Sequence, residues 1–67
     1  MDNTIRALRR ERNWTQEELA QKAHVSRQTI ISLEQGRYDP SIHLAFRLSR
    51  IFGKAIEEIF HDREENQ

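Results

Sequence analysis

The residues whose types best suit a chemical task lie on one face of a helix expected over residues 27–34. That face presents Arg27, Gln28, Ile31 and Ser32. In the major groove of DNA, Arg pairs with guanine, Gln pairs with adenine and Ser can bond several base edges, while an apolar side chain can contact a thymine methyl. The same residues on an arbitrary helix would be ordinary solvated surface, so they gain meaning only from the elements that position them.

The sequence gives little support for a metal site or for an enzyme active site. His24, His43 and His61 lack metal-ligand spacing, and the chain has no cysteine, so we expect no metal and no cofactor. The adjacent Glu57 and Glu58 point different ways on a helix, and no nucleophile is placed beside a base. We therefore expect that the protein is not an enzyme.

Two capped helices surround the turn that precedes residue 27. Thr15 at an N-cap and Glu18 three residues later form a capping-box pattern, and that helix must end near Ala23 because Ser26 caps the next one. Helices joined by so short a turn cross at roughly 90 to 120 degrees. Ala20 is small enough to permit their close approach.

The remaining sequence predicts further helices and no clear strand. We expect a first helix from about Asn3 or Thr4 to Arg12 and a third helix that ends before a left-handed Gly36. A fourth helix is expected to begin after the cap Ser41 and to run through Phe52, where Gly53 ends it. A short fifth helix is expected from about Ile56 to Phe60. The fold class is therefore all-α, a compact bundle of five helices in one domain over residues 1–61. Residues 62–67 form a polar, acidic tail.

Length and charge narrow the class of protein. Sixty-seven residues make one small domain, and no apolar run is long enough to span a bilayer, so we expect no membrane association and a cytoplasmic protein. The formal net charge is zero, but residues 1–54 hold ten basic and six acidic residues, while residues 55–67 hold one basic and five acidic. The basic body would suit a polyanion, although charge alone does not decide the partner.

A family resemblance joins these observations. The stretch from Thr15 to Arg37, TQEELAQKAHVSRQTIISLEQGR, resembles the Cro/phage-repressor family, also called the XRE family. The flanking segments IRALR, YDPS and IEEIF make it similar to the short, single-domain bacterial members. The resemblance implies a phage-repressor type of DNA-binding domain, in which the second and third helices form a helix-turn-helix over residues 16–35.

The resemblance also assigns roles to individual residues. The positions at which the family contacts bases are occupied by Arg27, Gln28 and Ser32. The positions at which it contacts DNA phosphates are occupied by Gln16, Thr29 and Arg37. A structural ion pair of the family is matched by Arg9 and Glu34. Ile31 is open to three interpretations: contact with a thymine methyl, packing on a neighbour, or exposure without consequence. The sequence departs from the family at His24, where relatives have a glycine in a left-handed turn.

These observations predict a sequence-specific regulator of transcription that binds double-stranded DNA. One recognition helix covers only about four base pairs, so we expect a homodimer, a palindromic operator and repression by occupancy, without an evident small-molecule effector. Bound to DNA, the protein would be associated with the nucleoid. The alternative is a protein-interaction module, antitoxin-like or polymerase-binding, with weak DNA binding.

The dimer interface is expected near the end of the chain. Ile56, Ile59 and Phe60 supply more apolar area than so short a helix on a small domain is expected to bury. The interface is therefore assigned to these three side chains, with the end of the fourth helix as a further contributor.

Overall fold

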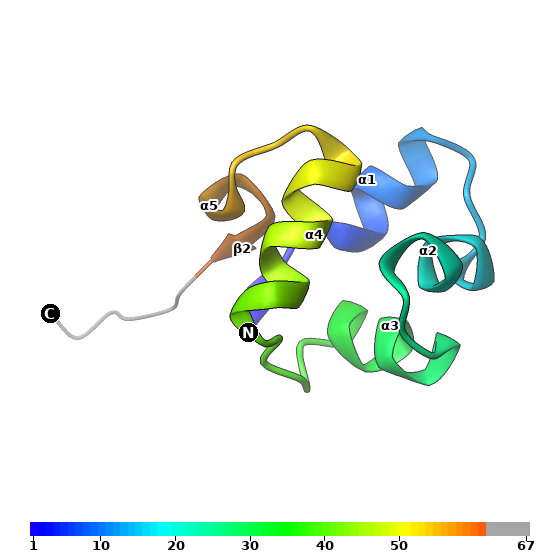
Figure 1. Ribbon diagram of the computed structural model, residues 1–67, viewed down its shortest axis with the longest axis horizontal. Helices are drawn as coiled ribbons and strands as arrows, with labels where there is room; N and C mark the ends of the chain where they lie inside the picture. Colours follow the sequence, from blue (N-terminus) through cyan, green and yellow to red (C-terminus); the bar gives the residue numbers. More distant parts are fainter. Residues whose placement is uncertain (62–67) are drawn as a thin grey trace, which may run out of the picture.

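Five helices and one short two-stranded ladder make up the part of the chain that the computed structural model describes, residues 1–61 (Figure 1). The acidic-tail prediction, on residues 62–67, lies outside this range. The elements are β1 (Asp2–Asn3), α1 (Ile5–Glu11), α2 (Gln16–Ala23), α3 (Arg27–Glu34), α4 (Ile42–Phe52), α5 (Ile56–Ile59) and β2 (Phe60–His61). No helix within residues 1–61 is long and apolar enough to cross a membrane.

The predicted starts of α2, α3 and α4 are confirmed by their caps. The hydroxyls of Thr15, Ser26 and Ser41 each accept a hydrogen bond from the backbone N–H three residues later, at 3.0 to 3.1 Å. At the start of α2, the Glu18 carboxylate also accepts the Thr15 N–H at 2.7 Å, which completes the capping box. These bonds satisfy backbone donors that a helix start would otherwise leave unpaired.

The ladder between the two ends of the described chain is a feature that the sequence did not predict. β1 and β2 run antiparallel, with Asp2 opposite His61 and Asn3 opposite Phe60. The Thr4 N–H extends this contact by donating to the Ile59 carbonyl at 2.9 Å. Consequently α5 ends at Ile59, one residue earlier than expected, because Phe60 is extended.

The core is built from every helix, so the bundle prediction is confirmed. Thirteen apolar side chains are buried, and α2 packs on both α3 and α4. The side chains with almost no solvent exposure are Ile5, Leu19, Ile30, Leu33, Leu48 and Ile59. Trp14, Val25, Ile51 and Ile56 lie partly buried at its edge.

Two of the three side chains expected at a dimer interface belong to this core. Ile59 is 0% exposed and Phe60 is 7% exposed in the single chain, while Ile56 is half-buried. The prediction that so short a helix cannot bury its apolar side chains is wrong for Ile59 and Phe60, because α5 packs against α4 and β2 pairs with β1. Ile59 therefore offers no exposed surface to a partner, and Phe60 exposes only a small area at the wall of an apolar groove.

Candidate nucleic-acid interface

The turn between α2 and α3 sets the angle of the candidate interface. His24 ends α2 with φ 59° and ψ 41°, which is the left-handed region. The following Val25 N–H donates to the Ala20 carbonyl at 3.1 Å, a bond that closes the helix end. Histidine therefore adopts here the backbone conformation that glycine adopts more readily.

The outward face of α3 holds the candidate base-contacting residues together. Arg27 and Gln28 are exposed, whereas Ile31 and Ser32 are half-buried at the margin of the same face. Ile30 and Leu33, on the opposite side of α3, are fully buried and fix the rotation of the helix. The four candidate side chains are thereby held on one helix, with the polar groups of Arg27 and Gln28 exposed to solvent.

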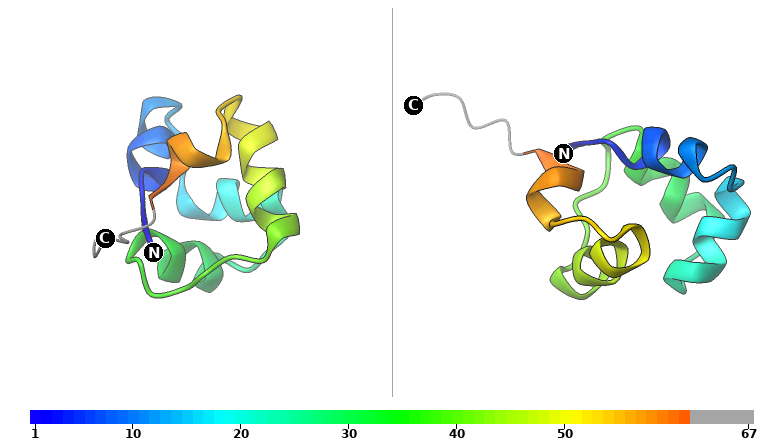
Figure 2. Two further views of the ribbon diagram at one scale, coloured as in Figure 1. Left: turned by 90° about the vertical axis from the view of Figure 1, so that its left-hand side faces the viewer. Right: turned by 90° about the horizontal axis from the view of Figure 1, so that it is seen from above.

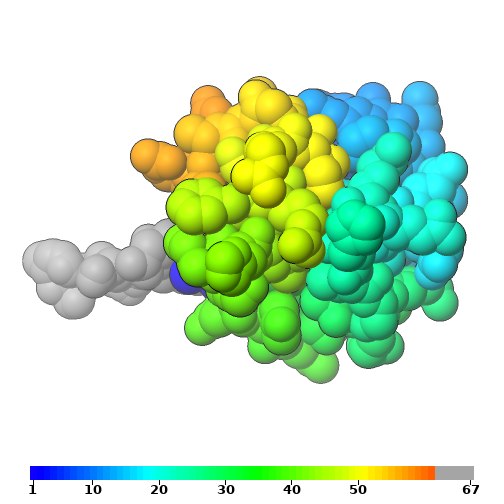
Figure 3. All heavy atoms as spheres, viewed as in Figure 1, coloured from blue at the N-terminus to red at the C-terminus, as the bar shows by residue number. Residues whose placement is uncertain are grey.

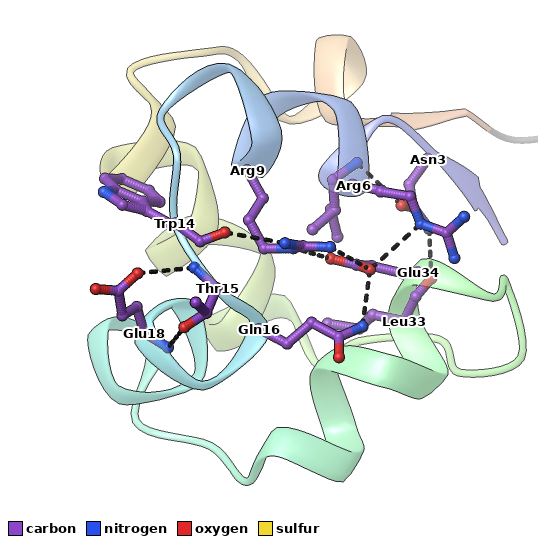
Figure 4. A network of polar contacts seen from close by, with 10 residues as sticks. Asn3, Arg6, Arg9, Trp14, Thr15, Gln16, Glu18, Leu33 and Glu34 are labelled. Atoms are coloured by element: carbon purple, nitrogen blue, oxygen red, sulfur yellow. Dashed lines mark hydrogen bonds and ion pairs between the residues drawn. The ribbon is translucent and has the colours of Figure 1, made fainter.

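The candidate phosphate-contacting residues lie at three different places around α3. Thr29 is on its first turn, where its hydroxyl lies 3.0 Å from that of Ser26. Arg37 is exposed just after the helix, and its backbone N–H donates to the Ser32 carbonyl at 3.0 Å. Gln16 opens α2, and its side-chain amide donates to the Glu34 carboxylate at 3.2 Å (Figure 4).

Glu34 is the centre of the polar network beneath Gln16. Its side chain is 0% exposed, and the Arg9 guanidinium donates from Nε to Oε2 at 2.6 Å and from Nη2 to Oε1 at 3.2 Å. Arg9 also donates to the Trp14 carbonyl at 2.9 Å. Because this paired fork joins α1 to α3 and to the loop before α2, it fixes the position of α2 relative to α3.

Burial and pairing shift the pKa of the Glu34 carboxyl in opposite directions. Burial alone raises its pKa, but hydrogen bonds from Arg9 and Gln16 and the charge of Arg9 outweigh that effect, so the pKa lies below the ordinary value. The same hydrogen bond raises the pKa of Arg9. Both groups are therefore charged at neutral pH, and the pair holds Gln16 by a charge-assisted bond.

Arg6 is a component of this network that the sequence did not single out. Its Nε lies 3.5 Å from Glu34 Oε1, and its side chain is 52% exposed. Two guanidinium groups thus face one carboxylate, so the network keeps one net positive charge beside Gln16.

Three further polar contacts of structural importance were also missed by sequence reasoning. The Asn3 amide donates to the Leu33 carbonyl at 2.7 Å, and Arg47 of α4 donates to the Ala23 carbonyl at the end of α2 at 2.8 Å. Arg12 donates to the Phe52 carbonyl at 2.9 Å. No local sequence pattern predicts these hydrogen bonds, because each joins residues at least 24 positions apart.

Comparison with known proteins agrees with this geometry. A helix-turn-helix family model matches residues 5–59, the span from the first residue of α1 to the last residue of α5. The chain belongs to the Cro-type helix-turn-helix family. This membership confirms the resemblance that the residues from Thr15 to Arg37 had indicated.

Relatives in the family include proteins of similar length and longer ones. A helix-turn-helix-type transcriptional regulator of Methanocaldococcus jannaschii is 53% identical over 60 residues, covering 90% of this chain and 91% of the relative. The regulator YgzD of Bacillus subtilis is 36% identical over 66 residues, covering 98% and 100%. The immunity repressor of Bacillus phage phi105 is 47% identical over 55 residues, covering 82% of this chain but 38% of the repressor. This domain therefore also occurs as part of longer proteins.

Proposed function

We propose that this protein is a sequence-specific regulator of transcription that binds double-stranded DNA and represses by occupying its operator. The observation that carries the proposal is the outward face of α3, where Arg27 and Gln28 are exposed while Ile30 and Leu33 anchor the helix in the core. An α-helix fits the major groove of B-DNA, and side chains at its exposed N-terminal part reach base edges.

Base readout is assigned to four side chains of α3. The Arg27 guanidinium can donate two hydrogen bonds to guanine, and the Gln28 amide can bond adenine through its donor and its acceptor. Ser32 lies one turn beyond Gln28 and supplies a hydroxyl. Ile31 is half-buried at the edge of this face, where it can contact a thymine methyl.

Phosphate contacts fix the register of α3 in the groove. Gln16 uses one N–H on Glu34, so its amide has a second N–H for a phosphate oxygen at the start of α2, where the helix dipole also favours an anion. Thr29 and Arg37 supply further donors near the two ends of α3. These contacts add affinity for any duplex sequence, whereas the bases determine which sequence is preferred.

A homodimer on a palindromic operator completes the proposal. A single α3 covers about four base pairs, which is too few to discriminate among genomic sites. Two copies related by a two-fold axis place their recognition helices about 34 to 36 Å apart, one turn of DNA. Relatives named as repressors support the sign of regulation, and we place the working protein on chromosomal DNA in the cytoplasm, without a small-molecule effector.

Selection from a pool of randomised duplexes tests the proposal. The purified chain should enrich a palindrome whose two halves are about one helical turn apart. The double variant Arg27→Ala, Gln28→Ala is the matched control, and it should enrich no sequence while keeping the thermal stability of the wild type. If the wild type enriches no sequence, the proposal fails, and the interaction-module alternative becomes the better description.

A further inference from the structure

An arginine of α4 contacts the C-terminal end of α2, next to the turn that leads into α3. The Arg47 guanidinium donates from Nη1 to the backbone carbonyl of Ala23 at 2.8 Å, and this bond is partly buried. Ala23 is the last residue of α2, so its carbonyl is one of the four at a helix end that have no partner within the helix. The positive charge of Arg47 also complements the partial negative charge of that helix end. Arg47 therefore caps α2 from a different helix.

The turn transmits the position of this helix end to α3. Only three residues separate Ala23 from Arg27, the first residue of α3. Within the turn, His24 has the left-handed φ of 59° and Val25 packs against the core. A connection this short leaves the end of α2 and the start of α3 little freedom to move separately. A contact that fixes Ala23 therefore also fixes the first turn of α3, which carries Arg27 and Gln28.

The other end of the helix-turn-helix is held by a different arginine. Arg9 of α1 binds Glu34, the last residue of α3, and donates to the carbonyl of Trp14 just before α2. Figure 2 shows that α2 runs from the side of the molecule on which α1 lies to the side on which α4 lies. Arg9 and Arg47 thus hold opposite ends of the same pair of helices.

The packing of the helices makes the contact from α4 important for α3. α3 packs on α2 and α1, and α4 packs on α2. Hydrogen bonds from Arg9 and Asn3 reach α3 in its last turn, at Glu34 and Leu33, whereas Arg47 acts beside its first turn. Figure 3 shows α4 and the segment that joins α2 to α3 side by side on the front of the molecule.

We infer that Arg47 is a positioning residue for base recognition, because by holding the end of α2 it fixes where the first turn of α3 meets the bases. What α3 reads rests on the proposed function, whereas the contact between Arg47 and Ala23 does not. Hydrogen bonds weaken steeply when their distance and angle depart from the preferred values, so a displaced first turn loses the paired bonds that distinguish bases. Affinity for an arbitrary duplex depends on phosphate contacts instead. Loss of Arg47 should therefore impair base discrimination more than general affinity.

The test compares Arg47→Met with Arg12→Met. Arg12 is the matched control, because its half-buried guanidinium donates to the Phe52 carbonyl at the end of α4 at 2.9 Å, outside the helix-turn-helix. Each variant removes a guanidinium that caps a helix end, so both should lower Tm by roughly 5 to 10 °C. Competition titrations with single-base variants of the selected operator then measure discrimination position by position. The positions read by Arg27 and Gln28 are those at which Arg27→Ala or Gln28→Ala loses its preference.

We expect Arg47→Met to lower discrimination about threefold or more at the positions read by Arg27 and Gln28. Its affinity for a non-specific duplex should stay within about twofold of the wild-type value, and the position read by Ser32 should change less. Arg12→Met should keep the wild-type discrimination at all of these positions, although it loses comparable thermal stability.

Hydrogen exchange of the free protein tests the contact without DNA. The Val25 N–H donates to the Ala20 carbonyl at 3.1 Å, so its exchange rate reports how well the end of α2 is held. Exchange at Val25 should be faster in Arg47→Met than in Arg12→Met at equal distance below Tm. Equal rates in the two variants would show that Arg47 does not hold this end, and the inference would fail.

The binding results can also overturn the inference. Equal discrimination by Arg47→Met and Arg12→Met would show that Arg47 only stabilises the fold. A loss of discrimination spread evenly over the operator, including the position read by Ser32, would show the same. If Arg47→Met does not fold, Arg47→Gln is judged by the same comparison, because its shorter side chain remains polar but lacks the guanidinium. If the wild type selects no duplex, the proposed function fails, and exchange at Val25 still decides whether Arg47 holds the turn.

Discussion

At the scale of single residues, Glu34 connects folding to the candidate interface. Its buried carboxylate binds Arg9, which fixes α1 to α3, and it accepts the amide of Gln16, which is the proposed phosphate contact. Because one carboxylate serves both purposes, a change at Glu34 should affect stability first and DNA binding as a consequence.

The substitution Glu34→Gln separates the charge of this residue from its shape. The variant leaves the Arg9 guanidinium, which is 11% exposed, without a counter-charge, so we expect unfolding to become easier by about 2 to 3 kcal/mol at pH 7. Urea unfolding followed by circular dichroism measures this difference. Glu11→Gln is the control, because the Glu11 side chain is 68% exposed and its loss should change the free energy of unfolding by under about 0.5 kcal/mol.

The difference in stability between the wild type and Glu34→Gln should depend on pH. The pKa of Glu34 is lowered on folding, so its contribution to stability is complete above the pKa of the unfolded carboxyl and is lost as the pH falls through the lower folded value. The stability difference between wild type and Glu34→Gln should therefore shrink below about pH 4.5, the ordinary glutamate value. A difference that stays constant down to pH 2 would contradict this account.

Two glutamines allow base recognition to be separated from phosphate binding. Gln28→Ala removes a proposed base contact, so it should relax the preference at one operator position by roughly 1 to 3 kcal/mol. Gln16→Ala removes a proposed phosphate contact and should weaken binding to all duplexes alike. Competition titrations with single-base operator variants measure both effects. Identical profiles for the two variants would show that these roles are wrongly assigned.

At the scale of elements, the left-handed turn at His24 carries a small conformational cost. A non-glycine residue at φ 59° is strained by about 1 kcal/mol, and glycine avoids this strain although it gains more entropy on unfolding. We expect His24→Gly to stabilise the fold by about 0.5 to 1 kcal/mol, measured as a rise in Tm. Asn13 has the same φ of 59°, but asparagine tolerates it better, so Asn13→Gly should have a smaller effect. A lower Tm for His24→Gly would show that its side chain makes a stabilising contact.

The boundaries of α2, α3 and α4 could be predicted because their signals are local. A hydroxyl at Thr15, Ser26 or Ser41 satisfies a backbone N–H only three residues away, so the pattern is visible in a short window. The end of α5 depended instead on the pairing of Asn3 with Phe60, which are 57 positions apart. Two-residue strands have no periodicity of their own, and thus nothing in the sequence distinguished them from loop.

At the scale of the whole molecule, the difference between local signals and tertiary contacts explains which parts of the candidate site could be predicted from the sequence. The outward face of α3 follows from its period and from its anchors Ile30 and Leu33, so its composition was evident from the sequence. The burial of Ile59 depended on how α5 packs against α4 and on the ladder beside it, which are tertiary contacts. The large apolar residues that remain exposed, such as Ile42 and Phe46, could be identified only after the core had been defined.

The spacing of the two half-sites tests the proposed assembly as a whole. A two-fold dimer holds its two α3 helices at one separation, so both can enter the major groove on the same side of DNA only when the half-site centres are about 10 base pairs apart. Inserting about 5 base pairs at the centre of the palindrome rotates one half-site to the opposite side of the duplex. We expect affinity to fall to that of an isolated half-site, measured by gel-shift titration. Inserting a full turn of DNA keeps both half-sites on one side but exceeds the reach of a dimer that holds its two α3 helices at one separation, so it should not restore tight binding. Equal affinity for all three spacings would show that the two copies bind independently.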